Sequence, residues 1–173
     1  RLFGHHDVAV LDGGLPKWKA EDRPVDDEPV DPRDRHFTAR RNAAMVRDVT
    51  QMARAVKLGD EQIVDARAPG RFRGEEPEPR KGLRSGHIPG SVNVHFRTLL
   101  NDDQTMKDPD SLRAIFEAAG VDLTRPVVTS CGSGVTAGIL SLALARIGHS
   151  RNAVYDGSWV EWGAYPDLPI ETG

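Results

Sequence analysis

Apolar and polar positions alternate from about residue 37 in blocks that predict strands and helices in turn. A set of apolar residues at helical spacing comes first and comprises Met45, Val49, Met52, Ala53 and Val56. Short runs with strand character follow at 62–65, 91–96, 126–130 and 153–155. Helices are predicted at 108–120 and 136–147. Strands separated by helices favour crossover connections, so we expect an α/β fold with a mostly parallel central sheet and helices on both faces.

An internal repeat relates the two ends of the chain. Residues 4–18 read GHHDVAVLDGGLPKW, and residues 148–162 read GHSRNAVYDGSWVEW. Each copy predicts a short strand, an Asp-Gly turn and the start of a helix that carries a Trp. The second copy closes the domain that begins near residue 37. We therefore expect residues 1–21 to be the C-terminal remnant of an earlier, similar domain. The first residue is Arg1, so the natural start is expected to lie upstream.

Residues 22–36 read DRPVDDEPVDPRDRH, and only Val25, Val30 and His36 in this segment are not Asp, Glu, Pro or Arg. So little apolar area cannot form a core, and the prolines favour an extended chain. We expect this segment to be an extended interdomain linker, followed by one domain at 37–173.

The composition limits the kinds of partner and site that the chain can have. The chain has 173 residues, 38% of them hydrophobic, and a formal net charge of -3, which gives no general reason to expect a nucleic-acid partner. Its longest apolar run, 137–145, is too short for a bilayer span, so no membrane partner is expected. The single cysteine excludes an internal disulfide and a four-thiolate zinc site. No targeting signal is recognised near the N-terminus, and a cytoplasmic location is the default expectation.

That cysteine, Cys131, lies between the predicted strand PVVTS and the predicted helix, in the loop CGSGVT. This junction is the usual ligand position in open α/β sheets. Gly132 and Gly134 allow backbone N–H groups to turn towards one point, and the following helix adds its positive end. Both effects favour a thiolate at neutral pH. The alternative is a buried structural cysteine, which is common for this residue type.

The loop also separates classes of cysteine enzyme. Phosphatases and arsenate reductases with a Cys-x5-Arg loop use the arginine to bind a tetrahedral oxyanion. Ala137 occupies that position here, which disfavours phosphate-ester hydrolysis. No local feature favours a papain-like Cys–His pair.

Four ordered stretches resemble the rhodanese-type sulfurtransferases, and specifically their mercaptopyruvate branch. They are CGSGVTA at 131–137, VDARAPGRFRGEEPEPR at 64–80, SGHIPGSVNV at 85–94 and YDGSWVEWG at 155–163. LDGGLPKW at 11–18 is similar to the end of the first domain in this family. The resemblance implies two rhodanese-like domains, with residues 1–21 left from the first and the catalytic cysteine in the second, at 37–173.

The resemblance also implies a persulfide relay. Cys131 would take sulfur from a small anionic donor, mercaptopyruvate or thiosulfate, and pass it to cyanide or to a thiol acceptor such as thioredoxin or a small thiol. No metal or organic cofactor is expected. A protein that holds the persulfide for a partner without turnover is the alternative of a different class.

The resemblance assigns further site residues around Cys131. Arg71 and Arg80 match the substrate-carboxylate arginines of the family. The uncharged Gly132 and Ser133 resemble the mercaptopyruvate type, because thiosulfate-preferring members carry basic residues there. Ser133 is expected to polarise the donor thiol or, alternatively, only to cap the helix.

The remaining predictions concern the loops on either side. The N–H groups of the active loop are expected to bind the donor, at Gly132, Gly134, Val135 and Thr136. We expect an ion pair for Arg67, solvated surface positions for Arg73, Lys81 and Arg84, and a role in loop geometry for His87. Trp159 and Trp162 are expected in the core.

Overall fold

A parallel sheet organises the chain from residue 46 to residue 155. The computed structural model describes residues 1–173. The sheet has five strands in the order β1-β5-β4-β2-β3, and every neighbouring pair is parallel. The strands are β1 (Val46–Arg47), β2 (Gln62–Asp65), β3 (Val92–Asn93), β4 (Val127–Ser130) and β5 (Asn152–Tyr155). All four residues of β4 are buried, as expected for the central strand of a sheet covered on both faces.

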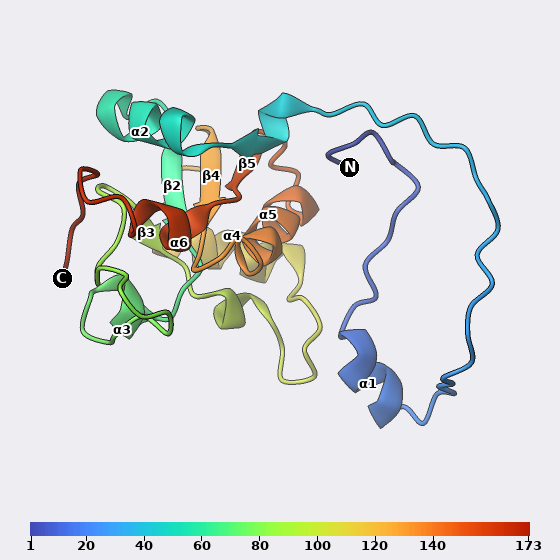
Figure 1. Ribbon diagram of the computed structural model, residues 1–173. Helices are drawn as coiled ribbons and strands as arrows, with labels where there is room; N and C mark the ends of the chain where they lie inside the picture. The colour runs from blue at the N-terminus through green and yellow to red at the C-terminus, as the bar shows by residue number, and fades with distance from the viewer.

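Helices cover both faces of this sheet (Figure 1). The helices of the chain are α1 (Gly14–Ala20), α2 (Val49–Leu58), α3 (Pro69–Phe72), α4 (Pro109–Ala118), α5 (Ala137–Arg146) and α6 (Ser158–Trp162), with short 3-10 helices η1 (Ala43–Met45) and η2 (Phe96–Leu99). Helix α1 lies apart from the sheet (Figure 1). One apolar cluster includes Phe116 of α4 and Leu140 of α5. A second cluster contains Met52 of α2 with Trp159 and Trp162 of α6. The predicted α/β fold, with a parallel sheet between two helical layers, is confirmed.

Most of the predicted helices and strands form, and the start of α4 shows why: its capping residues are readable in the sequence. The Asp108 side chain accepts hydrogen bonds from the N–H groups of Asp110 and Ser111, and Pro109 is the first helical residue of α4. The strand predicted at 91–96 is shorter, because η2 begins at Phe96. The helix expected from Met45 onward begins only at Val49, behind an Asp48 cap.

The two copies of the repeat differ in structure. The second copy forms β5 and α6, whereas the first forms only α1 and has no strand at residues 8–11. Residues 8–11 have no neighbouring strand in this chain, and a strand is stable only when its backbone groups are paired. The strand predicted in the first copy is therefore wrong for this chain.

Residues 22–36 contain no helix or strand, and all their side chains are exposed. They run as an extended arm between α1 and η1 (Figure 1). Their assignment as an interdomain linker, and that of 1–21 as a domain remnant, stays a prediction. None of the helices combines the length and apolarity that a bilayer span requires.

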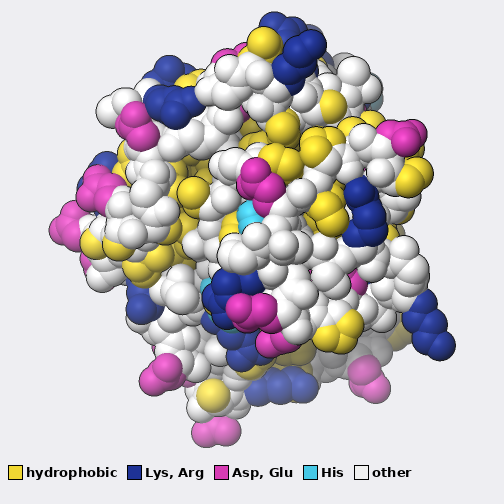
Figure 2. Space-filling view, turned by 90° about the vertical axis from the view of Figure 1, so that its left-hand side faces the viewer, with side chains coloured by type: hydrophobic (Ala, Val, Ile, Leu, Met, Phe, Trp, Pro, Cys, Tyr) yellow, Lys and Arg dark blue, Asp and Glu magenta, His cyan; other side chains and the backbone are white.

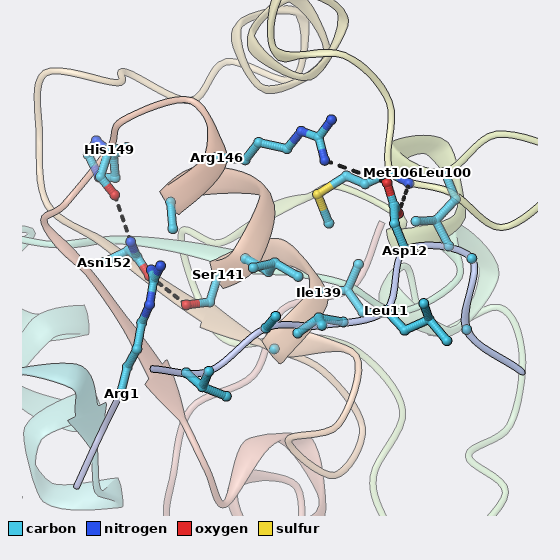
Figure 3. Close-up of a pocket in the computed structure, with 18 of the residues that line it drawn as sticks. Arg1, Leu11, Asp12, Leu100, Met106, Ile139, Ser141, Arg146, His149 and Asn152 are labelled. Carbon is cyan, nitrogen blue, oxygen red and sulfur yellow. Dashed lines mark hydrogen bonds and ion pairs between the residues drawn. The ribbon is translucent and has the colours of Figure 1, made fainter. Parts of the chain in front are cut away.

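The N-terminal segment contacts the domain beside α5 and at residues 103–106. The backbone N–H of Met106 donates to Asp12 over 2.8 Å, and Lys17 pairs with Asp103 at 3.0 Å. A cavity of about 1270 Å³ lies between this segment and α5, lined by residues such as Leu11, Ile139 and Ser141 (Figure 3). Its lining includes neither Cys131 nor residues 132–136.

Candidate active site

Cys131 is the first residue after β4, and the loop 131–136 leads from it into α5. Because the sheet is parallel, the residues after β4 and β5 lie at the same edge. The Cys131 and Gly132 carbonyls accept hydrogen bonds from the N–H groups of Trp159 and Val160, both at 2.9 Å. The start of α6 therefore holds the loop in place.

Gly134 gives the loop its shape. Its φ is +86°, and a Cβ at this position would lie 2.7 Å from the Asp156 carbonyl oxygen. Both facts require glycine. In this conformation the Gly134 N–H donates to the Cys131 sulfur over 3.1 Å. The loop thus turns a backbone donor towards the thiol, as the two glycines predicted.

Hydrogen bonds from neighbouring groups oppose the effect of burial on the pKa of the thiol. Cys131 is 2% exposed, and burial raises the pKa of its thiol. The groups that lower the pKa are the Thr136 hydroxyl, the N–H groups of Ala137 and Ser133, and the Ser158 hydroxyl. Together they outweigh burial and leave the pKa of Cys131 below its usual value. Cys131 is as buried as a structural cysteine, but its environment stabilises the thiolate.

Ser158 is a site residue that the sequence analysis did not identify. Its side-chain oxygen accepts a hydrogen bond from the Cys131 N–H over 3.1 Å and lies 3.9 Å from the sulfur. The same hydroxyl is 2.8 Å from the Tyr155 carbonyl oxygen. Ser158 has a φ of +50°, which is unusual for a residue with a side chain. The Asp-Gly-Ser turn directly after β5 is visible in the sequence, but its place beside the loop after β4 is set by the pairing of β4 with β5.

Arg67 and Arg71 form a ladder of ion pairs with two buried carboxylates, those of Asp65 and Glu78, next to this loop. Arg67 pairs with Asp65 at 2.8 Å, which confirms the predicted ion pair, and with Glu78 at 2.9 Å. Arg71 pairs with the same Glu78 at 2.6 Å. Its Nη2 lies 2.9 Å from the place that a Cβ on Gly132 would occupy. Of the two predicted substrate arginines, Arg71 thus lies against the active loop.

The other predicted site residues differ in exposure and in their contacts. Arg80 is exposed, and its guanidinium forms no ion pair or hydrogen bond within the chain. Ser133 is exposed, and its hydroxyl does not cap α5. The Val135 side chain is 77% exposed. Thr136 lies close enough to hydrogen-bond the sulfur, and Gly132 is partly buried.

The flanking loop holds one further correction. Arg84 is not a solvated surface residue, because its guanidinium donates to the main-chain carbonyls of Gly163 and Leu168 at 3.1 and 2.9 Å. Arg73 pairs with Glu75 on the surface, as expected. His87 is buried, and its Nδ1 lies 2.8 Å from the Phe72 carbonyl oxygen, consistent with a role in loop geometry.

Two observations concern the core and the grouping of possible metal ligands. Trp159 and Trp162 are fully buried, as predicted. No group of three or more His, Cys, Asp and Glu side chains gathers in the structure as a metal site would require.

The fold and site define an α/β protein with a hydrogen-bonded cysteine in a glycine loop at the carboxyl edge of a parallel sheet. A model of the Rhodanese-like domain matches residues 48–165, and the chain belongs to the rhodanese family. Among curated relatives, human 3-mercaptopyruvate sulfurtransferase is 42% identical over 175 residues, covering 100% of this chain and 59% of the relative. Bovine thiosulfate sulfurtransferase is 45% identical over 173 residues, covering 99% and 58%.

Solved structures agree with this fold. SseA from Escherichia coli, described as a 3-mercaptopyruvate sulfotransferase with the rhodanese fold, has a TM-score of 0.79 and 38% identity, covering 92% of this chain and 59% of its own. Tum1 from Saccharomyces cerevisiae has a TM-score of 0.84 and 30% identity, covering 98% and 62%. The chain spans 58% to 60% of the length of the first curated relatives.

Proposed function

We propose that this chain carries the catalytic cysteine of a sulfurtransferase that moves sulfur from 3-mercaptopyruvate, through a persulfide on Cys131, to cyanide or a thiol. The observation that carries this proposal is the Cys131 sulfur, which receives the Gly134 N–H at 3.1 Å and whose pKa lies below the usual thiol value. A thiolate held by fixed N–H donors is both a nucleophile and a stabilised anion.

The first half-reaction forms an S–S bond at Cys131. The thiolate attacks the thiol sulfur of mercaptopyruvate, the carbon–sulfur bond breaks, and the thiol proton ends on the methyl group of pyruvate. With thiosulfate the same attack on the outer sulfur breaks its S–S bond and releases sulfite. In both cases Cys131 becomes a persulfide anion. The N–H donors of the loop would stabilise this anion as they stabilise the thiolate.

The second half-reaction returns the thiolate. Cyanide or an acceptor thiolate attacks the outer sulfur, the S–S bond breaks, and thiocyanate or a new persulfide leaves. Thioredoxin or a small thiol fits the acceptor role. The balance needs no oxidant, metal or organic cofactor. Because the first product leaves before the acceptor reacts, ping-pong kinetics are expected.

Donor binding is assigned to the loop and to the two arginines. Arg71 and Arg80 would bind the donor carboxylate, and the N–H groups of Gly132, Gly134, Val135 and Thr136 would surround the transferred sulfur. Ser133, exposed at the loop mouth, would polarise the donor thiol. The uncharged pair of Gly132 and Ser133 favours mercaptopyruvate over the dianion thiosulfate.

We also propose the domain organisation of the natural protein. Residues 1–21 would end a first rhodanese-like domain, 22–36 would link the domains, and 37–173 would be the catalytic domain. The repeat at 4–18 and 148–162 supports this division, as does the share of 58% to 60% that the chain covers in its relatives. The first domain would then be a structural partner of this chain.

Steady-state kinetics on the protein at its natural full length test the proposal. We expect kcat/KM for mercaptopyruvate to exceed that for thiosulfate, with cyanide as the common acceptor, and Cys131→Ser to abolish both activities. A preference for thiosulfate would make the protein a thiosulfate-type rhodanese. Sulfur loading without release to any small thiol or cyanide would instead support the persulfide carrier.

A further inference from the structure

The Glu78 carboxylate lies buried between two arginines. Its side chain is 2% exposed, and it accepts hydrogen bonds from Arg67 Nη1 at 2.9 Å and from Arg71 Nη2 at 2.6 Å. A second bond from Arg71 Nε, at 3.2 Å, makes that contact bidentate. A buried carboxylate with this many charge-assisted bonds fixes the position of its partners.

Arg67 is the anchored side of this arrangement. Its guanidinium also donates to Asp65 and to the Gly86 carbonyl oxygen, both at 2.8 Å. Its face lies 4.5 Å from the centroid of the Trp159 ring. The Arg67 side chain is therefore held from three sides, and it holds Glu78 in turn.

Arg71 is the free side of the arrangement. Glu78 occupies the Nε–Nη2 edge of the guanidinium, and Arg71 Nη1 has no hydrogen-bond partner in the structure. The Arg71 side chain is 25% exposed, with Nη2 directly beside Gly132. The Nη1–Nη2 edge of Arg71 thus remains available for an anion next to Cys131, and a planar edge of this kind matches a carboxylate.

Charge on this side of the molecule is balanced locally. Figure 2 views the side where α3 and the C-terminus lie in Figure 1, and it shows Lys and Arg side chains interspersed with Asp and Glu side chains. In the ladder the carboxylates of Asp65 and Glu78 match the guanidinium groups of Arg67 and Arg71. Arg71 is thus a cation whose field is already partly offset by Glu78.

We propose that Glu78 is a positioning and specificity residue, which aims the free edge of Arg71 at the donor and favours a singly charged carboxylate over a doubly charged donor. This inference rests on the proposed function, because it assigns the donor to Arg71. The negative charge of Glu78 repels a dianion about twice as strongly as a monoanion at the same distance. Specificity here comes from a repulsive group as well as an attractive one.

The test compares Glu78→Gln with the parent protein at its natural full length. The amide keeps the size of the side chain but removes the charge. We expect the ratio of kcat/KM for thiosulfate to kcat/KM for mercaptopyruvate to rise about 5-fold, mainly through a lower KM for thiosulfate. A merely structural role would lower kcat/KM for both donors by the same factor and leave the ratio unchanged, which would overturn the proposal.

Two further variants keep the test decisive. Glu75→Gln removes an exposed acid that pairs with Arg73 in the same loop, and it should leave the donor ratio unchanged. Glu78→Asp keeps the charge but shortens the side chain, so KM should rise for both donors while their ratio is preserved. If Glu78→Gln does not fold, unchanged KM values in Glu78→Asp would overturn the proposal.

Binding separates this inference from the proposed function. If the parent protein turns over neither donor, the proposed function fails. The dissociation constants of thiosulfate and mercaptopyruvate are then measured in a Cys131→Ser background, with and without Glu78→Gln. A shift of their ratio towards thiosulfate supports the role of Glu78, and an unchanged ratio overturns it.

Discussion

The N–H of Gly134 lies 3.1 Å from the sulfur of Cys131, three residues earlier in the chain. That approach depends on the left-handed backbone of Gly134 and on its contact with the Asp156 carbonyl region. The surroundings of the Cys131 thiol after β4 therefore depend on the turn after β5. The chemistry of Cys131 depends on the packing of two adjacent strand ends rather than on the loop sequence alone.

Gly134→Ala should disturb both folding and reactivity. The added methyl group meets the Asp156 carbonyl oxygen at 2.7 Å, and the left-handed φ is strained for alanine. We expect a loss of about 3 kcal/mol of unfolding free energy and alkylation of Cys131 slower by about 10-fold at pH 7. Chemical denaturation and iodoacetamide kinetics measure the two effects.

Gly120→Ala is the matched control for that variant. Gly120 has the same φ of +86° but no atom within 4 Å of the added methyl group. It should lose only about 1 kcal/mol and keep the alkylation rate of the parent. Equal effects of the two variants on Cys131 would contradict the role given to Gly134.

Ser158→Ala should raise the pKa of the Cys131 thiol, because the Ser158 hydroxyl is one of the groups that lower it. The buried Cys131 N–H also loses its acceptor, at a cost of about 1–3 kcal/mol. Ser141→Ala removes a hydroxyl that donates to Asn152 and not to the sulfur, and it should leave the alkylation profile unchanged. If both variants alkylate alike, Ser158 does not act on the thiol.

Thr136→Val should move the pH dependence of Cys131 reactivity upward. The Thr136 hydroxyl is the largest of the groups that lower the pKa of Cys131, and its loss leaves burial less opposed. The thiolate fraction at a given pH then falls, so the alkylation rate reaches half of its plateau at a higher pH than in the parent. A profile that stays in place or moves to lower pH would contradict this account.

Arg67→Met should destabilise the fold strongly. The substitution leaves the carboxylates of Asp65 and Glu78 buried with fewer partners, which costs about 3–5 kcal/mol when a buried pair is broken. Arg73→Met breaks the exposed pair with Glu75 and should leave the denaturation midpoint unchanged. Similar midpoints for the two variants would mean that the buried ladder does not stabilise the domain.

Limited trypsin digestion should cut first between residues 33 and 41. Arg33 and Arg35 lie in an exposed segment without helix or strand, and neither precedes proline. The product should be a resistant fragment that contains Cys131. A first cut within 46–162 would contradict the boundary placed near residue 37.

Local signals in the sequence were enough for much of this molecule. Asp108 and Pro109 define the start of α4, and the junction of strand and glycine loop identifies Cys131. These features depend on residues close together in the chain. Arg67 was also predictable, because Asp65 lies two residues away at the same strand end.

Other features depend on residues that only the fold brings together. Ser158 reaches Cys131 because β5 lies beside β4, and no local pattern contains that fact. Arg84 binds carbonyl groups after α6, about 80 residues further along the chain. The strand predicted in the first copy of the repeat does not form for the same reason, since pairing requires a neighbouring strand that the local sequence does not specify.

Sulfur loading of Cys131 tests the central claim most directly. The full-length protein is incubated with mercaptopyruvate without acceptor. The mass of the peptide that contains Cys131 is then measured by mass spectrometry before and after cyanide is added. We predict a gain of one sulfur atom on this peptide, lost again on cyanide with formation of thiocyanate. An unchanged mass at Cys131, in a protein that still releases sulfur from the donor, would contradict the account.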